Sequence, residues 1–231
     1  ADGDDREYGD PNSVFGGDID GIADGDTLAS VVSGTLVFPT AATQLSNVGF
    51  YDIIGSGLTV INSNYALTIL QDAGNFGALQ ITPAQLSYVS NEASREYGDA
   101  NPLFSGTVEG LKNGDLLTSV TSGTLTFVTS AGFTTPVGNY DINGTGLTVT
   151  SGNYVATIVQ DGGNSTQLQI VPAQLYYAAN PMTTIYGNDV PPATGTVQGL
   201  KNGESLTSVT IGTLVWTAFA NSGNDVGVYA I

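Results

Sequence analysis

Short apolar runs rich in Val, Ile, Leu, Thr and Tyr alternate with turns rich in Gly, Asn and Pro along the whole chain. This pattern is typical of β-strands joined by tight turns, so it predicts a mostly β fold. In the middle of the chain the expected strands span residues 85–90, 104–109, 124–129, 140–142, 147–150, 154–160 and 167–171. The dipeptide Asn113-Gly114 favours a tight turn with positive φ.

The clearest expected hairpin joins strands 154–160 and 167–171, where Val155, Val159 and Leu168 occupy alternating positions around a Gly-Gly turn. The same arrangement occurs earlier in the chain, with strands 67–71 and 79–81 on either side of residues 72–75. Strict alternation of this kind indicates strands with one buried face.

One segment of the pattern predicts a short helical turn instead of a strand. Asp115 is placed to cap residues 116–120, and Gly123 to stop the helix. Asp26, residues 28–32 and Gly34 repeat the arrangement.

One sequence motif recurs three times at a spacing of 89 residues. Its markers are Tyr8-Gly9, Tyr97-Gly98 and Tyr186-Gly187, with Gly114 and the joint residues Pro83 and Pro172 in the same register. A fixed long period is the sign of a repeat architecture. We therefore expect three tandem β domains at 1–83, 84–172 and 173–231, each elongated and joined end to end by short, stiff Pro joints.

The first and third copies are incomplete relative to the second. Copy one lacks the opening strand and copy three lacks its last four strand segments. Unpaired edges invite another chain to add strands. Two interpretations stay open: a cut made without regard to the fold, or neighbouring chains that complete one another into a fibre.

Composition excludes several classes of function. The chain has 21 acidic residues against 4 basic ones, a formal charge of −17, and neither Cys nor His. Such a surface repels phosphate backbones and anionic lipid headgroups, so we expect no nucleic-acid partner. No apolar run reaches 18 residues, so we expect no membrane insertion. The missing His removes the commonest general base and metal ligand.

Two groups of residues are candidates for binding. Tyr97 and Tyr154 belong to recurrent Tyr-Gly and Asn-Tyr segments, and they would stack on a host glycan or contact a host protein; the competing interpretation packs the Tyr-Gly tyrosines at the joints between domains, with each hydroxyl bonded locally. A weak calcium site is the second candidate, because hard oxygens cluster at Asp18, Asp20, Asp24 and Asp26. The other copies do not keep these acids, so surface acids on a hairpin are the simpler account.

The arginines before two of the tyrosines point away from their Glu neighbours in an extended chain. Arg6 and Arg95 are therefore expected to bind a carboxylate or carbonyl elsewhere in their own domains. Trp216, in the place of Phe38 and Phe127, is expected in the core. Paired carboxylates with regular spacing lie beside turns and are not kept in copy three, so we predict no enzyme activity.

These motifs together resemble the MBG domain of the YGX type. They comprise the Tyr-Gly pairs, Gly-Leu-Lys-Asn-Gly-Asp at 110–115, Val-Gly-Asn-Tyr-Asp-Ile at 137–142, Asn-Tyr at 153–154, and the Pro-Ala pairs at 83–84 and 172–173. The resemblance implies a mostly β stalk module found as tandem arrays in large bacterial surface proteins similar to filamentous haemagglutinins. It therefore implies an extracellular location, adhesion or biofilm as the role of the parent, other repeats of that parent as partners, and no catalytic residues.

Overall fold

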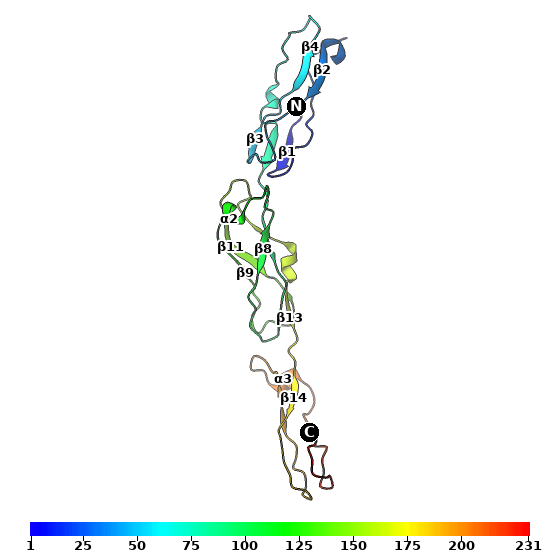
Figure 1. Cartoon of the computed structure of the whole chain (residues 1–231), viewed down its shortest axis with the longest axis vertical. Coiled ribbons are helices and arrows are strands. Elements are labelled where there is room, and N and C mark those ends of the chain that lie inside the picture. The colour runs from blue at the N-terminus through cyan, green and yellow to red at the C-terminus, as the bar shows by residue number, and fades with distance from the viewer. The chain divides into compact units, whose positions relative to one another are not determined.

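The computed structural model describes residues 1–231 (Figure 1). Strands make up 30% of the chain and helices 9%, which confirms the predicted mostly β fold. The strands are β1 (Asp4–Glu7), β2 (Val32–Val37), β3 (Gly49–Tyr51), β4 (Ser56–Val60), β5 (Leu79–Thr82), β6 (Ser87–Ser90), β7 (Ala93–Glu96), β8 (Gly106–Glu109), β9 (Thr121–Val128), β10 (Gly138–Tyr140), β11 (Asn143–Val149), β12 (Val159–Gln160), β13 (Leu168–Val171), β14 (Tyr176–Ala179) and β15 (Gly195–Gln198). The helices are α1 (Leu28–Val31), α2 (Leu117–Val120) and α3 (Leu206–Val209), with 3-10 turns η1 (Ala73–Asn75) and η2 (Gly162–Thr166).

The chain packs as two compact units. The first contains Ala1–Ser90, Ser105–Phe127 and Asn143–Gly162, and the second contains Asn91–Phe104, Val128–Ile142 and Gly163–Ile231. The units follow packing and do not coincide with the three sequence repeats, because the second repeat contributes residues to both. None of the α-helices is long and apolar enough to cross a membrane.

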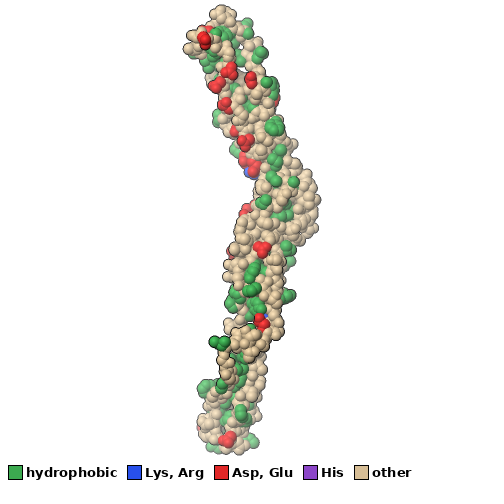
Figure 2. All heavy atoms as spheres, turned by 180° about the vertical axis from the view of Figure 1, so that it is seen from behind, with side chains coloured by type: hydrophobic (Ala, Val, Ile, Leu, Met, Phe, Trp, Pro, Cys, Tyr) green, Lys and Arg blue, Asp and Glu red, His purple; other side chains and the backbone are tan.

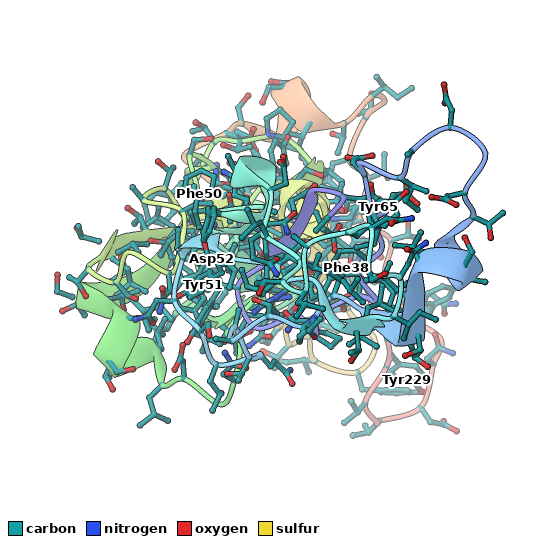
Figure 3. The ribbon with its side chains drawn as sticks, turned by 90° about the horizontal axis from the view of Figure 1, so that it is seen from above. Phe38, Phe50, Tyr51, Asp52, Tyr65 and Tyr229 are labelled. Atoms are coloured by element: carbon teal, nitrogen blue, oxygen red, sulfur yellow. The ribbon has the colours of Figure 1, made fainter.

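The first unit contains a three-stranded sheet in the order β1-β5-β3. The central strand β5 runs parallel to β1 and antiparallel to β3. Leu79 and Ile81 on β5 are almost fully buried, whereas Gln80 between them is exposed, as period-two alternation requires. The neighbouring strand β3 carries Phe50 and Tyr51, labelled with Asp52 in Figure 3.

The same unit holds the sheet β12-β6-β8 and the pairs β2-β4 and β11-β9. Tyr88 on β6 is buried and packs edge-on against Phe127, with ring centroids 6.4 Å apart. Its hydroxyl accepts a hydrogen bond of 3.3 Å from the backbone N–H of Leu147 on β11. Tyr88 thereby ties three elements of the core together.

The second unit contains the sheet β10-β13-β7 and the pair β14-β15. Leu168 and Ile170 on the central strand β13 are buried together with Ile142. Trp216 packs edge-on against Tyr177 at 6.0 Å, the counterpart of the pair that Phe127 and Tyr88 make. Trp216 is only half-buried, so it fills the expected position less completely than Phe127 does.

The predicted hairpin of strands 154–160 and 167–171 is wrong. Only Val159 and Gln160 form a strand there, and β12 pairs in parallel with β6. β13 pairs in parallel with β7 and antiparallel to β10. The turn η2 separates β12 from β13, and the earlier copy behaves likewise, with η1 preceding β5. The central strands β5 and β13 therefore pair with segments that are distant in sequence, and not with the segment that directly precedes them.

The predicted helical turns exist, but their expected ends are wrong. Leu116 is the N-cap of α2 in place of Asp115, and Thr27 is the N-cap of α1 in place of Asp26. Gly123 lies inside β9, so it does not stop the helix. The turn at Asn113 and Gly114 has the predicted positive φ values of 54° and 78°. It does not close a hairpin, because β8 pairs with β6.

One hollow lies in the first repeat and another in the third. One of about 280 Å³ is lined by residues 182–188 and 226–231, whose counterparts in β7 and β10 flank β13. The other, of about 780 Å³, is lined by residues 18–20 and 67–72, whose counterparts in β8 and β12 flank β6.

Candidate functional site: the joint between repeats

Each Tyr-Gly pair lies in a chain reversal, which we call the Tyr-Gly corner and define as Glu7–Asp10, Glu96–Asp99 and Ile185–Asn188. The reversal is closed by a backbone hydrogen bond, from the N–H of Asp10 to the carbonyl of Glu7 at 3.1 Å in the first corner. It begins where β1 ends, so the parallel pairing of β1 with β5 sets its position.

A buried arginine supports the first corner from within its own repeat. The Nη2 atom of Arg6 donates to the carbonyl of Thr43 at 2.6 Å, and Nη1 donates to the carbonyl of Glu7 at 3.3 Å. Nε donates to Oδ1 of Asn12 at 2.7 Å. The prediction that this arginine binds a carbonyl of its own domain is confirmed.

Arg95 makes the equivalent contacts in the second corner. It donates to the carbonyl of Gly132 at 2.6 Å, to that of Glu96 at 3.1 Å, and to Oδ1 of Asn101 at 2.6 Å. The third repeat has Thr184 at this position, so its corner is held without an arginine.

The first corner contacts a turn 102 or more residues further along the chain. We call this turn the receiving turn and define it as Lys112–Asp115, Lys201–Glu204 and, in the first repeat, Ala23–Asp26. A Cβ atom placed on Gly9 would lie 2.4 Å from Cβ of Lys112, so only glycine leaves room for the lysine. Gly9 also has φ of +86°, which other residues rarely adopt. The Tyr-Gly motif is therefore shaped to fit the lysine of the next repeat.

Lys112 then joins the two carboxylates of the corner. Its Nζ atom lies 2.9 Å from Oε1 of Glu7 and 2.8 Å from Oδ1 of Asp10. Hydrogen bonding to Asp10, and then to Glu7, raises the pKa of Lys112 above its ordinary value. The three side chains are half-exposed, so the ion pairs contribute specificity more than stability.

Two tyrosines share one carboxylate beneath this ion pair. The hydroxyl of Tyr154 donates to Oδ2 of Asp115 at 2.8 Å and accepts from the N–H of Lys112 at 2.9 Å. The hydroxyl of Tyr8 donates to the same Oδ2 at 3.2 Å. The two rings meet edge-on at 5.6 Å, and both are buried. Burial, reinforced by Asp115, raises the pKa of Tyr154 to about 12.

A loop of the first repeat widens the contact. Asn113 donates from Nδ2 to the carbonyl of Gln44 at 3.2 Å, and Gln44 donates in turn to the carbonyl of Gly9 at 2.7 Å. Asn153 accepts at 3.0 Å from the N–H of Val48. Lys112, Asn113 and Asn153 therefore all bind the preceding repeat, which explains why these motifs recur together.

The second joint, which lies within the second unit, repeats the first with the same residue spacings. Tyr97 donates to Oε1 of Glu204 at 2.9 Å. Lys201 places Nζ 2.5 Å from Oδ1 of Asp99 and 3.8 Å from Oε2 of Glu96. Asn202 donates to the carbonyl of Phe133 at 3.1 Å. The joint is thus a recurrent structure of this chain.

The two tyrosine candidates both lie in joints. Tyr154 is 3% exposed, so its ring offers no face for a sugar to stack on. Tyr97 is half-buried, with its hydroxyl bound to Glu204. The Tyr-Gly tyrosines pack at the joints, as one interpretation expected, but the hydroxyls of Tyr8 and Tyr97 bind the following repeat and are not bonded locally. The hydroxyl of Tyr154 binds Asp115 of its own repeat. Glycan binding by these residues remains a prediction.

The calcium candidates gain no support from the fold. No group of three or more acidic side chains in the chain is arranged to hold a metal ion, and this includes Asp18, Asp20, Asp24 and Asp26. Asp26 accepts a hydrogen bond of 2.7 Å from the hydroxyl of Tyr65, labelled in Figure 3. Figure 2 shows acidic side chains spread over the N-terminal part of the face in view.

Sequence reasoning missed the partners of the joint. It assigned Asn113-Gly114 to a tight turn and Asp115 to a helix cap, whereas Lys112, Lys201 and Asp115 all contact the preceding repeat. The signal was present in the shared register, since the Tyr-Gly and Lys-Asn-Gly motifs recur at the same spacing.

Comparison with known families agrees with this repeat structure. The model of the MBG domain (YGX type) matches residues 1–76, 86–163 and 175–231. No curated protein and no solved structure matches the chain significantly. MBG repeats occur in extracellular bacterial proteins and form a structural repeat family, not an enzyme family. Three matched segments cover most of the chain, and it therefore belongs to the MBG domain (YGX type) family as a tandem array of these repeats.

Proposed function

We propose that this chain is a stalk segment of a bacterial cell-surface or secreted adhesin, holding a distal binding region away from the cell and so contributing to adhesion or biofilm formation. The observation that carries the proposal is the recurrent joint. Each repeat fixes its neighbour through a buried or half-buried tyrosine, an ion pair and an asparagine bond. Side chains that hold successive modules in one arrangement serve a mechanical role, because they resist bending.

The route of the chain between repeats supports the same role. β5 leads through Pro83 and the fully buried Ala84 towards β6. The N–H of Ala84 donates to the carbonyl of Asn153, and its own carbonyl accepts from Val155, both at 2.9 Å. Both backbone groups of Ala84 are thus hydrogen-bonded to residues 153–155, and the proline before it limits rotation.

Small-angle X-ray scattering of the intact chain tests the proposal. A compact protein of this length would have a radius of gyration of about 17 Å. A stalk predicts a value clearly above this and a pair-distance distribution with a long tail. A value near that of the compact globule would contradict the stalk.

A joint variant and a matched control test whether the joint contacts stiffen the array. Tyr8→Phe combined with Lys112→Ala removes two contacts of the first joint and should broaden the distance distribution through bending. Tyr140→Phe removes a hydroxyl that bonds only to Pro136 within its own repeat, and it should leave the scattering unchanged. Equal effects of the two variants would show that the joint contacts do not stiffen the array.

A further inference from the structure

The receiving turns of the second and third repeats both carry the dipeptide Asn-Gly, as Asn113-Gly114 and Asn202-Gly203. Asparagine is a thermolabile residue, because the backbone nitrogen of the next residue can attack its side-chain amide. A following glycine has no side chain and leaves that nitrogen unshielded. Each of these turns is therefore chemically labile as well as part of a joint.

The chain contains a third Asn-Gly pair, Asn143-Gly144, and the structure separates it from the other two. The N–H of Gly144 donates to Oε1 of Gln160 at 2.8 Å. Gly144 is buried, and a Cβ atom placed on it would lie 2.3 Å from Cγ of Tyr88. The nitrogen that would attack Asn143 is thus both hydrogen-bonded and enclosed.

The corresponding nitrogens of the two receiving turns are open. The N–H groups of Gly114 and Gly203 make no hydrogen bond within the chain, and both glycines are exposed. A Cβ atom on either glycine would meet no atom within 4 Å. A nitrogen free of a hydrogen bond can lose its proton and approach the amide carbon, so reaction is favoured at Asn113 and Asn202 over Asn143.

We propose that Asn113 and Asn202 are sites of spontaneous deamidation, and that this modification weakens the joints as the protein ages. At the first site the backbone nitrogen of Gly114 forms a bond to Cγ of Asn113, the bond from Cγ to Nδ2 breaks, and ammonia leaves with the proton of that nitrogen. Water then opens the resulting succinimide ring at one of its two carbonyls, which gives aspartate or isoaspartate. The proposal goes beyond the stalk function and does not depend on it.

Both products remove a contact of the joint. Nδ2 of Asn113 donates to the carbonyl of Gln44 at 3.2 Å, and Nδ2 of Asn202 donates to that of Phe133 at 3.1 Å. After deamidation an oxygen takes the place of the donor, so two acceptors face each other without a proton between them. The carbonyl of the preceding repeat then loses its partner, which disfavours the docked arrangement.

Isoaspartate has the larger effect because it lengthens the backbone of the turn. The N–H of Asp115 donates to the carbonyl of Lys112 at 2.8 Å and closes the turn around the modified residue. These same two residues bind the preceding repeat, Lys112 through Asp10 and Asp115 through Tyr8. The additional backbone carbon between them changes their spacing, so the two contacts cannot both keep their present geometry.

A time course of the intact chain tests the sites. The isotope-labelled protein is held in mildly alkaline buffer while NMR follows its side-chain amide signals. Those of Asn113 and Asn202 should disappear as ammonia is released, and those of Asn143 should last about tenfold longer, the factor that one ordinary hydrogen bond adds to a barrier. Equal lifetimes at the three sites, or lasting signals at Asn113, overturn the proposal.

Gly114→Ala identifies the attacking nitrogen and keeps Asn202 as an internal control. The added methyl group meets no atom within 4 Å but shields the nitrogen, so loss at Asn113 should slow while Asn202 keeps its wild-type rate. The positive φ of this residue strains the variant, so circular dichroism checks its fold. Unchanged or faster loss at Asn113 contradicts attack by the nitrogen of residue 114.

The consequence for the joint is measured in the same spectra. The backbone amide signals of Tyr8, Gly9 and Gln44 should shift in step with the loss at Asn113, and Asn113→Asp should reproduce the aspartate part of that change in fresh protein. The signal of Tyr140, whose hydroxyl bonds within its own repeat, should not move. Unmoved signals of Tyr8 and Gly9 in the deamidated protein overturn the weakening of the joint.

Discussion

The hydroxyl of Tyr8 donates a hydrogen bond to Oδ2 of Asp115, across 107 residues of chain. This separation exceeds the 89-residue period, so the bond joins consecutive repeats. Tyr97 and Glu204 reproduce it at the same separation although the acceptor is a longer side chain. The conserved geometry with a changed acceptor indicates that the position of the carboxylate matters more than the residue that carries it.

The fit of Lys112 over Gly9 predicts a large effect of Gly9→Ala. The new Cβ would lie 2.4 Å from Cβ of Lys112, next to the lysine backbone, so the joint must separate. The positive φ adds strain of about 1 kcal/mol. We expect a total destabilisation roughly 1–3 kcal/mol larger than that strain, as for overpacked cores. Scanning calorimetry measures it.

Gly187→Ala is the matched control for this change. Gly187 has the same φ, within a degree, but a Cβ there would meet nothing within 4 Å. It should therefore show the strain alone. Equal losses of stability for the two variants would mean that Lys112 moves aside without an energetic cost. Gly9 would then be needed only for its backbone conformation.

The joint is expected to weaken in alkaline solution. Burial raises the pKa of Tyr154 to about 12, so the folded joint favours the neutral phenol. The stability from this preference is complete below pH 10 and is lost between pH 10 and 12, at most ~3 kcal/mol. The raised pKa of Lys112 acts in the same direction, because the ammonium held by Asp10 and Glu7 is lost as pH rises. Unfolding measured from pH 8 to 12 should show this loss.

Tyr154→Phe checks the assignment of this alkaline effect. The variant loses the bond to Asp115 at all pH values, so it should be less stable at pH 8 but fall less steeply above pH 10. Tyrosinate absorbance should also lose its latest-titrating component. A wild-type titration in which every tyrosine ionises near pH 10 would contradict the buried network.

The arginine beneath the corner should not tolerate lysine. Arg95 is 7% exposed and donates to the carbonyls of Glu96 and Gly132 and to Asn101. A lysine cannot reach these diverging acceptors at once, so Arg95→Lys should cost about 2 kcal/mol. Lys201→Met, which removes a half-exposed ion pair, should cost less than about 1 kcal/mol. Urea unfolding measures the loss of stability in both variants. Equal losses would contradict the role of Arg95 as a buried support of the corner.

Much of the architecture was predictable because it depends on local pattern. Short strands alternate between buried and exposed positions, so the strands near residues 87–90, 106–109 and 168–171 were found at about their true bounds. The side chains of Arg6 and Glu7 point to opposite faces of an extended segment and cannot pair, which correctly placed the guanidinium on a carbonyl elsewhere in the same repeat, that of Thr43.

The pairing of strands was not predictable from neighbouring residues. Residues 154–160 alternate like a strand, yet β12 contains only the last two, and the chain then enters η2, in which Asn164 is buried. β13 is thereby freed to pair in parallel with β7, more than 70 residues earlier. The joint was not predicted for the same reason, since Lys112 and its carboxylates are brought together only by docking of separate repeats.

Gly123 on β9 and Gly146 on β11 supply a last prediction. A Cβ on Gly123 would lie 2.2 Å from the carbonyl oxygen of Gly146, and a Cβ on Gly146 would lie 2.1 Å from that of Thr124. The clashing atoms are backbone atoms of paired strands, so relief requires the strands to part. Gly123→Ala should therefore destabilise the chain by roughly 2–4 kcal/mol more than Gly212→Ala.

Gly212 is the matched control because its φ of +102° equals that of Gly123 within a degree, while a Cβ there would meet nothing within 4 Å. Hydrogen exchange should accelerate in β9 and β11 of the Gly123 variant and stay at wild-type rates in β13 of the other unit. Gly34→Ala provides a replicate, since its Cβ would lie 2.1 Å from the carbonyl oxygen of Gly57 in the β2-β4 pair. If Gly123 and Gly34 tolerate alanine as well as Gly212 does, the close approach of these strands is not required by the repeat, and the glycines recur for their backbone conformation alone.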